Sequence, residues 1–153
     1  MSAFEVLAVS EVRSGENLEA MVRRRAASSL PADGALLARA QASVREFFSG
    51  WASRGAPAVA WGASHQALTL FAGAASGARP RVIIDSATFK HGTYAPATGI
   101  PIVAPSADAL AGAGAVLVIA SGYEAEIART LRESLGFRGE VWSVRGHELR
   151  RLD

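Results

Sequence analysis

The chain has 153 residues, half of them apolar, and contains no cysteine. A domain of this length buries enough surface to be stable without a disulfide or a metal, and the lack of cysteine excludes thiol nucleophiles and Cys-ligated zinc. The net charge is only +2, and the arginine clusters lack the interleaved aromatic residues of a base-stacking surface. We therefore expect no nucleic-acid partner.

The apolar runs are too short to cross a membrane, which requires about 20 residues, so we expect no membrane partner. The N-terminal stretch MSAFEVLAVSEV lacks the basic start and unbroken apolar run of an export signal, which predicts a cytoplasmic protein. The histidines His65, His91 and His147 are scattered along the chain and predict no metal site.

Three parts are expected along the chain: an N-terminal hairpin or extension over 1–30, a connecting helix over 31–55, and a Rossmann-like domain over 56–153. Residues 4–12 alternate in polarity, and the turn SGEN lets the next segment return as a second strand or begin a helix; we favour the hairpin. The helix is indicated by apolar residues at helical spacing, namely Leu36, Leu37, Ala40, Val44, Phe47, Phe48 and Trp51.

From residue 56 onward, short apolar runs alternate with helical segments. The runs predict strands at 57–61, 81–85, 100–105, 115–120 and 140–144, with helices at 66–75, 106–111 and 123–135. Strands that are apolar on both faces are typical of a parallel sheet covered by helices, so the predicted fold class is α/β, a three-layer Rossmann-like domain with a mostly parallel sheet. Pro101 lacks the amide that a central strand uses, which predicts an edge strand or a strand start there.

The bend Gly62-Ala63-Ser64-His65-Gln66 after the first of these strands admits three interpretations. A glycine at the carboxyl end of a parallel strand favours phosphate binding, but the dinucleotide fingerprint needs two further glycines that are missing here. A nucleophile elbow, G-x-S-x-G, needs a glycine where Gln66 stands. We therefore expect Ser64 to cap the following helix, and we predict no catalytic residue.

The stretch that ends the second strand, DSATFKHGTYAPATGIPIVAP (85–105), is the most unusual in the chain. Asp85 stands where a Rossmann acid binds ribose hydroxyls, or else it caps a turn. The aperiodic residues that follow hold the only lysine, Lys90, and loops of this length in compact domains are functional or disordered. Because carboxyl ends of parallel strands meet at one edge of a sheet, we expect Gly62 and Lys90 to share a cleft.

Three apolar residues of this stretch, Phe89, Tyr94 and Ile100, suggest that the loop packs on the domain.

Taken together, the two segments resemble the C-terminal domain of the sugar C-methyltransferases that act on nucleotide-linked deoxysugars. That family typically shows G-A-x-x-K-G-N-T-L and, after the second strand, D-x-x-x-x-K-x-G-x-x-x-P-G-x-x-I-P-V. The matching residues keep the spacing: Gly62, Ala63, Thr69 and Leu70 in the first motif, and Asp85, Lys90, Gly92, Pro96, Ile100 and Pro101 in the second. The resemblance is strong over 58–105 and weak before residue 30.

The resemblance implies a domain of, or accessory to, an S-adenosylmethionine-dependent C-methyltransferase that binds a nucleotide sugar or a related anionic molecule. The expected contacts are Gly62, Ala63, Ser64, His65, Gln66, Thr69, Asp85, Lys90, His91 and Tyr94. Lys90 would supply a phosphate-binding charge and Tyr94 a stacking face. S-adenosylmethionine is expected on a missing or separate domain, so the chain alone is not expected to transfer a methyl group. The expected protein partner is a methyltransferase domain or a second copy of the chain.

The chain departs from the family pattern in the first motif. Gln66 replaces the usual lysine, Ala67 replaces a glycine and Leu68 replaces an asparagine. Two alternatives therefore stay open: a structural or dimerisation module with a vestigial cleft, and a small stand-alone enzyme that uses His65 or His91 as acid or base near neutral pH.

Overall fold

The computed structural model describes residues 4–12, 17–24, 31–72, 74, 78–145 and 147–152. The chain divides into two compact units, Met1–Gly34 and Ala35–Asp153. In the first unit, β1 (Phe4–Val12) pairs antiparallel with β2 (Asn17–Arg24), which confirms the predicted hairpin.

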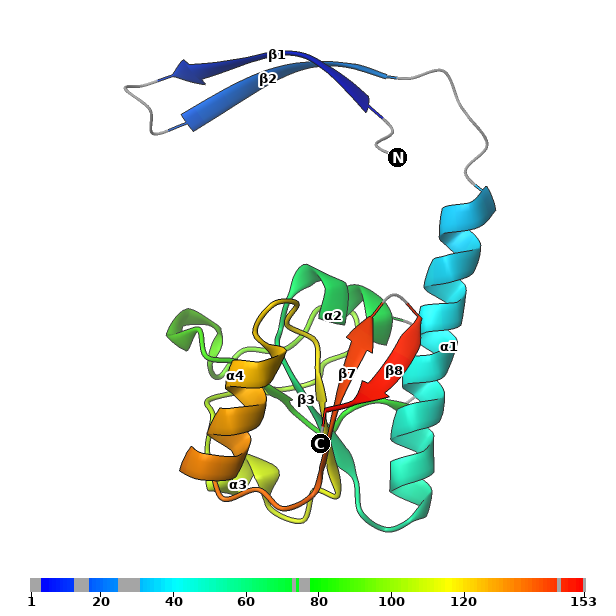
Figure 1. The fold of residues 1–153 in the computed structure, drawn as a ribbon, viewed down its shortest axis with the longest axis vertical. Coiled ribbons are helices and arrows are strands. Elements are labelled where there is room, and N and C mark those ends of the chain that lie inside the picture. Colours follow the sequence, from blue (N-terminus) through cyan, green and yellow to red (C-terminus); the bar gives the residue numbers. More distant parts are fainter. Residues whose placement is uncertain are drawn as a thin grey trace. The chain divides into compact units, whose positions relative to one another are not determined.

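The second unit, cyan to red in Figure 1, is built on a six-stranded sheet. The strand order is β5-β4-β3-β6-β7-β8. The first five strands in this order are parallel, and β8 pairs antiparallel with β7. Their bounds are β3 (Ala58–Trp61), β4 (Ile83–Ile84), β5 (Ile102–Val103), β6 (Ala115–Val118), β7 (Glu140–Arg145) and β8 (Glu148–Arg151). From β3 the chain moves outward to β4 and β5, then crosses to β6 and β7, so the strand order reverses between β3 and β6.

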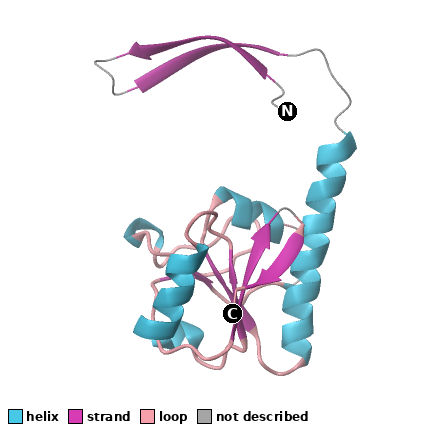
Figure 2. Cartoon of the chain, viewed as in Figure 1, coloured by secondary structure: helices cyan, strands magenta, loops and turns pink. Residues whose placement is uncertain are grey.

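Helices cover both faces of the sheet. They are α1 (Pro31–Ser53), α2 (His65–Phe71), α3 (Ala107–Leu110) and α4 (Glu124–Arg129); η3 (Thr130–Ser134) extends α4 as a π-helical turn, and η2 (Thr88–Lys90) is a 3-10 turn. Figure 2 shows strands lying between α1 and α4. Among the described residues, no helix has both the length and the hydropathy that a membrane crossing needs.

The two layers of core follow from the alternation of side chains along the strands. In β3, Ala58 and Ala60 belong to the cluster that includes α1 and α2, whereas Val59 and Trp61 belong to the cluster that includes α3 and α4. All four side chains are buried, which is why the strand is apolar on both faces. The predicted Rossmann-like α/β fold is confirmed.

The edges of the sheet hold one confirmed prediction and one element that the sequence analysis missed. β5 follows Pro101 directly and lies at an edge, as its missing amide predicted. β8 forms the other edge and was not predicted, because Glu148, Arg150 and Arg151 resemble a solvated chain end. Charged residues are common on edge strands, where they hinder pairing with other chains.

Fewer apolar side chains of the loop after β4 pack on the domain than predicted. Ile100 is buried, with 2% exposure, but Phe89 and Tyr94 are 82% and 68% exposed, so their predicted packing was wrong. The backbone of the loop is nevertheless well bonded: Gly92 N–H donates to Ile102 O at 3.0 Å, and Tyr94 forms a bridge with Pro101. Backbone hydrogen bonds therefore order this loop, and the two rings extend from it.

Candidate functional site

The turn after β3 rests directly on the turn after β6. Gly62 adopts φ +108°, and a Cβ atom there would lie 2.5 Å from the carbonyl oxygen of Ile119. Only glycine allows both this conformation and this approach. The contact falls between β3 and β6, where the strand order reverses and where open α/β sheets bind their ligands.

Ser64 caps α2, as predicted. Its Oγ accepts a hydrogen bond from Ala67 N–H at 3.2 Å and donates to Ile119 O at 3.3 Å. The hydroxyl proton is therefore directed to a backbone carbonyl and not to a base, so the arrangement offers no activated nucleophile.

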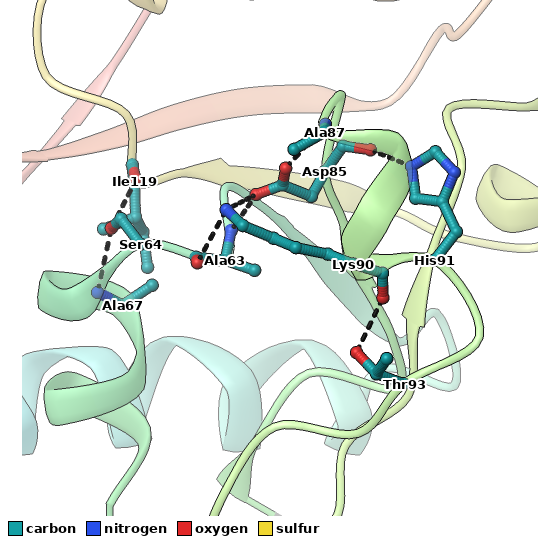
Figure 3. A network of polar contacts seen from close by, with 9 residues as sticks. All are labelled: Ala63, Ser64, Ala67, Asp85, Ala87, Lys90, His91, Thr93 and Ile119. Carbon is teal, nitrogen blue, oxygen red and sulfur yellow. Dashed lines mark hydrogen bonds and ion pairs between the residues drawn. The ribbon is translucent and has the colours of Figure 1, made fainter.

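Asp85 is the centre of a polar network that joins the ends of β3 and β4 (Figure 3). Its Oδ2 accepts from Ala63 N–H at 2.7 Å and from Lys90 Nζ at 3.0 Å, and its Oδ1 accepts from Ala87 N–H at 2.8 Å. Burial alone would raise the pKa of this carboxyl group. The hydrogen bonds from Ala87, Ala63 and Lys90, together with the lysine charge, outweigh burial and hold the pKa below its ordinary value.

Lys90 connects the loop after β4 to the turn after β3. Its Nζ donates to Ala63 O at 3.1 Å as well as to Asp85, which confirms that the two predicted segments meet. A lysine ammonium has three N–H donors, so one has no hydrogen-bond partner in the described part of the chain. The side chain is 28% exposed. The ammonium group is therefore held in place, and part of the lysine side chain remains accessible.

His91 is fixed by the same network. Its Nε2 lies 2.7 Å from the backbone oxygen of Asp85. Because a carbonyl oxygen only accepts, Nε2 carries the proton in this arrangement, and Nδ1 is the nitrogen left for other partners. We call Asp85, Lys90, His91 and the backbone of Ala63 the Asp85–Lys90 clamp.

Three other predicted contacts lie outside the clamp, on α2. His65, Gln66 and Thr69 line a groove of about 400 Å³ between α1 and α2. The groove also contains residues that the sequence analysis did not predict as contacts: Leu36, Leu37, Ala40, Leu70 and His147. Two of them, Leu36 and Leu37, are 47% and 41% exposed.

The predicted residues thus fall into two neighbouring groups. Gly62 and Ser64 shape the turn, the clamp lies on one side of it, and the groove begins at His65, two residues after Ala63. Tyr94 belongs to neither group among the contacts described. His147 was missed because it reaches the groove only through the turn between β7 and the unpredicted β8.

Fold and site together define a Rossmann-like α/β domain with a polar clamp and an adjoining groove at the carboxyl edge of its sheet. The model of the family described as the C-methyltransferase C-terminal domain matches residues 10–143. The chain belongs to this family, and it is associated with methyltransferases. No curated protein matches the chain.

Proposed function

We propose that this domain binds a nucleotide sugar, or a related anionic small molecule, as part of or accessory to an S-adenosylmethionine-dependent C-methyltransferase. The observation that carries the proposal is the ammonium group of Lys90, which two oxygen acceptors hold at the carboxyl edge of the sheet while one N–H stays available. Ligands of open α/β sheets bind at this edge, and lysine binds phosphate as a point charge.

The clamp alone offers an anion limited attraction, because the negative charge of Asp85 offsets the positive charge of Lys90 at 3.0 Å. Affinity must therefore come from direct contact with the free N–H and from a second, uncharged part of the ligand. The groove supports this, since its leucine walls, two imidazoles and the Gln66 amide suit a sugar or a base. A nucleotide sugar has both an anionic part and ring parts.

We propose that S-adenosylmethionine binds on another domain or chain. A Rossmann-type cofactor site needs an open backbone after its first strand and an acid free to bind ribose after its second. Here Gly62 packs against Ile119, and Asp85 already accepts three hydrogen bonds from its own chain. These residues do not fit that mode of binding. We therefore assign methyl transfer to a methyl-donor domain as partner, and to this chain the binding and orientation of the substrate.

A structural role is favoured by one observation: the clamp needs no ligand to satisfy its carboxylate. Asp85 joins β3, β4 and the following loop through bonds within the chain. A domain whose clamp only braces this edge would serve as a module for association with a methyl-donor domain or a second copy.

Calorimetric titration with uridine, thymidine, cytidine and guanosine diphosphate sugars separates these functions. Urea unfolding in the presence of the ligand gives a second readout. A ligand at 100 times its Kd should add about 2.7 kcal/mol to the free energy of unfolding. His65→Ala is expected to weaken binding about tenfold, because it removes a groove wall next to the clamp. Glu133→Ala is a control, since Glu133 is exposed on η3 and lines neither clamp nor groove. No binding by any of these compounds would refute substrate binding and favour the structural module.

A further inference from the structure

A second hollow, of about 350 Å³, lies at the opposite edge of the sheet from the clamp. It is formed where the chain enters the strands: Pro57 precedes β3, Arg79 and Arg81 precede β4, and Ile100 and Pro101 precede β5. Because these strands are parallel, their amino ends lie at one edge and the clamp at the other. The hollow is therefore a separate candidate site.

The charged residues that line this hollow are all positive. Two arginines line it, and none of its lining residues is acidic. Arg79 Nη1 donates to Thr98 O, and Arg81 Nη2 donates to Ala109 O at 3.1 Å and to Ala111 O at 2.9 Å. Neither guanidinium pairs with a carboxylate in the described part of the chain. Neutral carbonyls thus position both groups without neutralising them.

The partly buried position of Arg79 makes the lack of a counter-charge costly. Removing a cation from water without an anionic partner is unfavourable, and a bound anion would offset that cost. A guanidinium has five N–H donors, of which Arg79 uses one and Arg81 uses two in the bonds described. Donors therefore remain on both side chains.

The walls restrict the kind of anion. Phe48 and Ile100 are apolar, and Pro57, Pro80 and Pro101 have no backbone N–H to offer. A phosphate, with oxygens pointing in several directions, would find few donors besides the arginines. A carboxylate needs only one planar pair of donors, which is the fork that a guanidinium presents, and its apolar body matches the walls.

We propose that this hollow binds a small carboxylate with an apolar body, recognised by the guanidinium group of Arg79. The inference does not depend on the proposed function of the clamp. It assigns to the domain a second ligand site at the amino edge of the sheet.

The test is a titration of the ¹⁵N-labelled chain with benzoate, followed by amide chemical shifts. Saturable shifts are expected at the amides of Arg81, Gly99 and Ile100, with a Kd on the order of 1–10 mM, as suits a ligand of this size. Benzyl alcohol, of similar shape but neutral, is expected to bind at least about tenfold more weakly.

Variants connect the binding to the arginine. Arg79→Gln is expected to weaken benzoate binding at least about tenfold, and Arg79→Lys to weaken it less, since lysine keeps the charge but loses the fork. Arg145→Gln, at the exposed end of β7, is the matched control and is expected to bind as the original chain does. Unperturbed spectra elsewhere in each variant show that the fold is intact.

The proposal is overturned if benzoate produces no saturable shifts, if benzyl alcohol binds equally well, or if Arg79→Gln leaves the titration unchanged. Shifts confined to the amides of Ala63, Ala87 and His91 would also overturn it, because they would place benzoate at the clamp. That last outcome would leave the proposed function untouched.

Discussion

Substitutions that remove the charges of Lys90 and Asp85, singly and together, should show that the two side chains are coupled by about 1–3 kcal/mol in the free energy of unfolding. Two unit charges 3.0 Å apart attract by roughly 5 kcal/mol at an effective dielectric of 20, before desolvation is counted. The side chains are 28% and 11% exposed, which places the pair between surface pairs, worth about 0–1 kcal/mol, and buried pairs, whose breakage costs about 3–5 kcal/mol. The expected value lies between these limits.

A double-mutant cycle measures this coupling: Lys90→Met, Asp85→Asn and the double variant, each unfolded with urea at pH 7. The pair of Arg151 and Glu140 is the matched control, because it is longer, at 3.4 Å, and its side chains are 53% and 31% exposed. A cycle with Arg151→Met and Glu140→Gln should give no more than about 0.5 kcal/mol.

Acidification provides the second arm of the same test. The pKa of Asp85 is lower in the folded chain than its ordinary value, so the stabilisation is fully present above the unfolded pKa of about 3.9 and is lost as the pH falls through the folded pKa. The coupling should therefore shrink at the lowest pH at which the variants still unfold cooperatively. A coupling below about 0.3 kcal/mol at pH 7, or one that does not decrease once the pH is below the unfolded pKa of about 3.9, would refute the reasoning.

Three further substitutions test other parts of the site. Gly62→Ala is expected to cost about 2–4 kcal/mol in urea unfolding, because its Cβ would lie 2.5 Å from Ile119 O, whereas Gly136→Ala, with φ +64° and open space, should cost about 1 kcal/mol; equal losses would contradict the close contact. Ala97→Gly is expected to stabilise the chain by about 0.5–1 kcal/mol, because Ala97 has φ +63° where the family motif has glycine; a lower unfolding midpoint would argue against strain there. Gln66→Lys, which restores the family lysine, should tighten nucleotide-sugar binding about tenfold and make it more sensitive to salt; an unchanged Kd in calorimetry would contradict the proposed ligand position.

Most of the fold could be predicted because local pattern and tertiary environment agree. The strand runs are apolar on both faces, and alternate residues of β3 contact different core clusters, which is what a doubly covered sheet requires. Pro101 placed β5 at an edge for a purely chemical reason, its missing N–H. β8 was not predicted because its residues are mostly charged, as is common on an exposed edge strand, and lack the apolar pattern of a buried strand.

The site was predicted less completely, because its contacts depend on how elements pack. Asp85 and Lys90 were each predicted to contact a ligand, and that stays a prediction. Their contact with one another was not predicted, although the D-x-x-x-x-K spacing, which a 3-10 turn closes, could have indicated it. Phe89 was expected to pack because it is aromatic, yet the loop is ordered by backbone hydrogen bonds and leaves the ring in solvent. The groove joins α1, α2 and the turn before β8, which no single stretch of sequence reveals.

The loop after β4 also covers the edge strand β5, so that a strand of another chain cannot pair with it there. Ile102, in β5, donates its N–H to Thr93 O and accepts from Gly92 N–H, so its outward backbone groups are already occupied by the chain itself. The opposite boundary is β8, four residues long, where Glu148 and Arg150 are exposed. Unpaired edges are the templates for amyloid-like stacking and strand exchange. A second polypeptide is therefore not expected to extend the six-stranded sheet at β5 or β8.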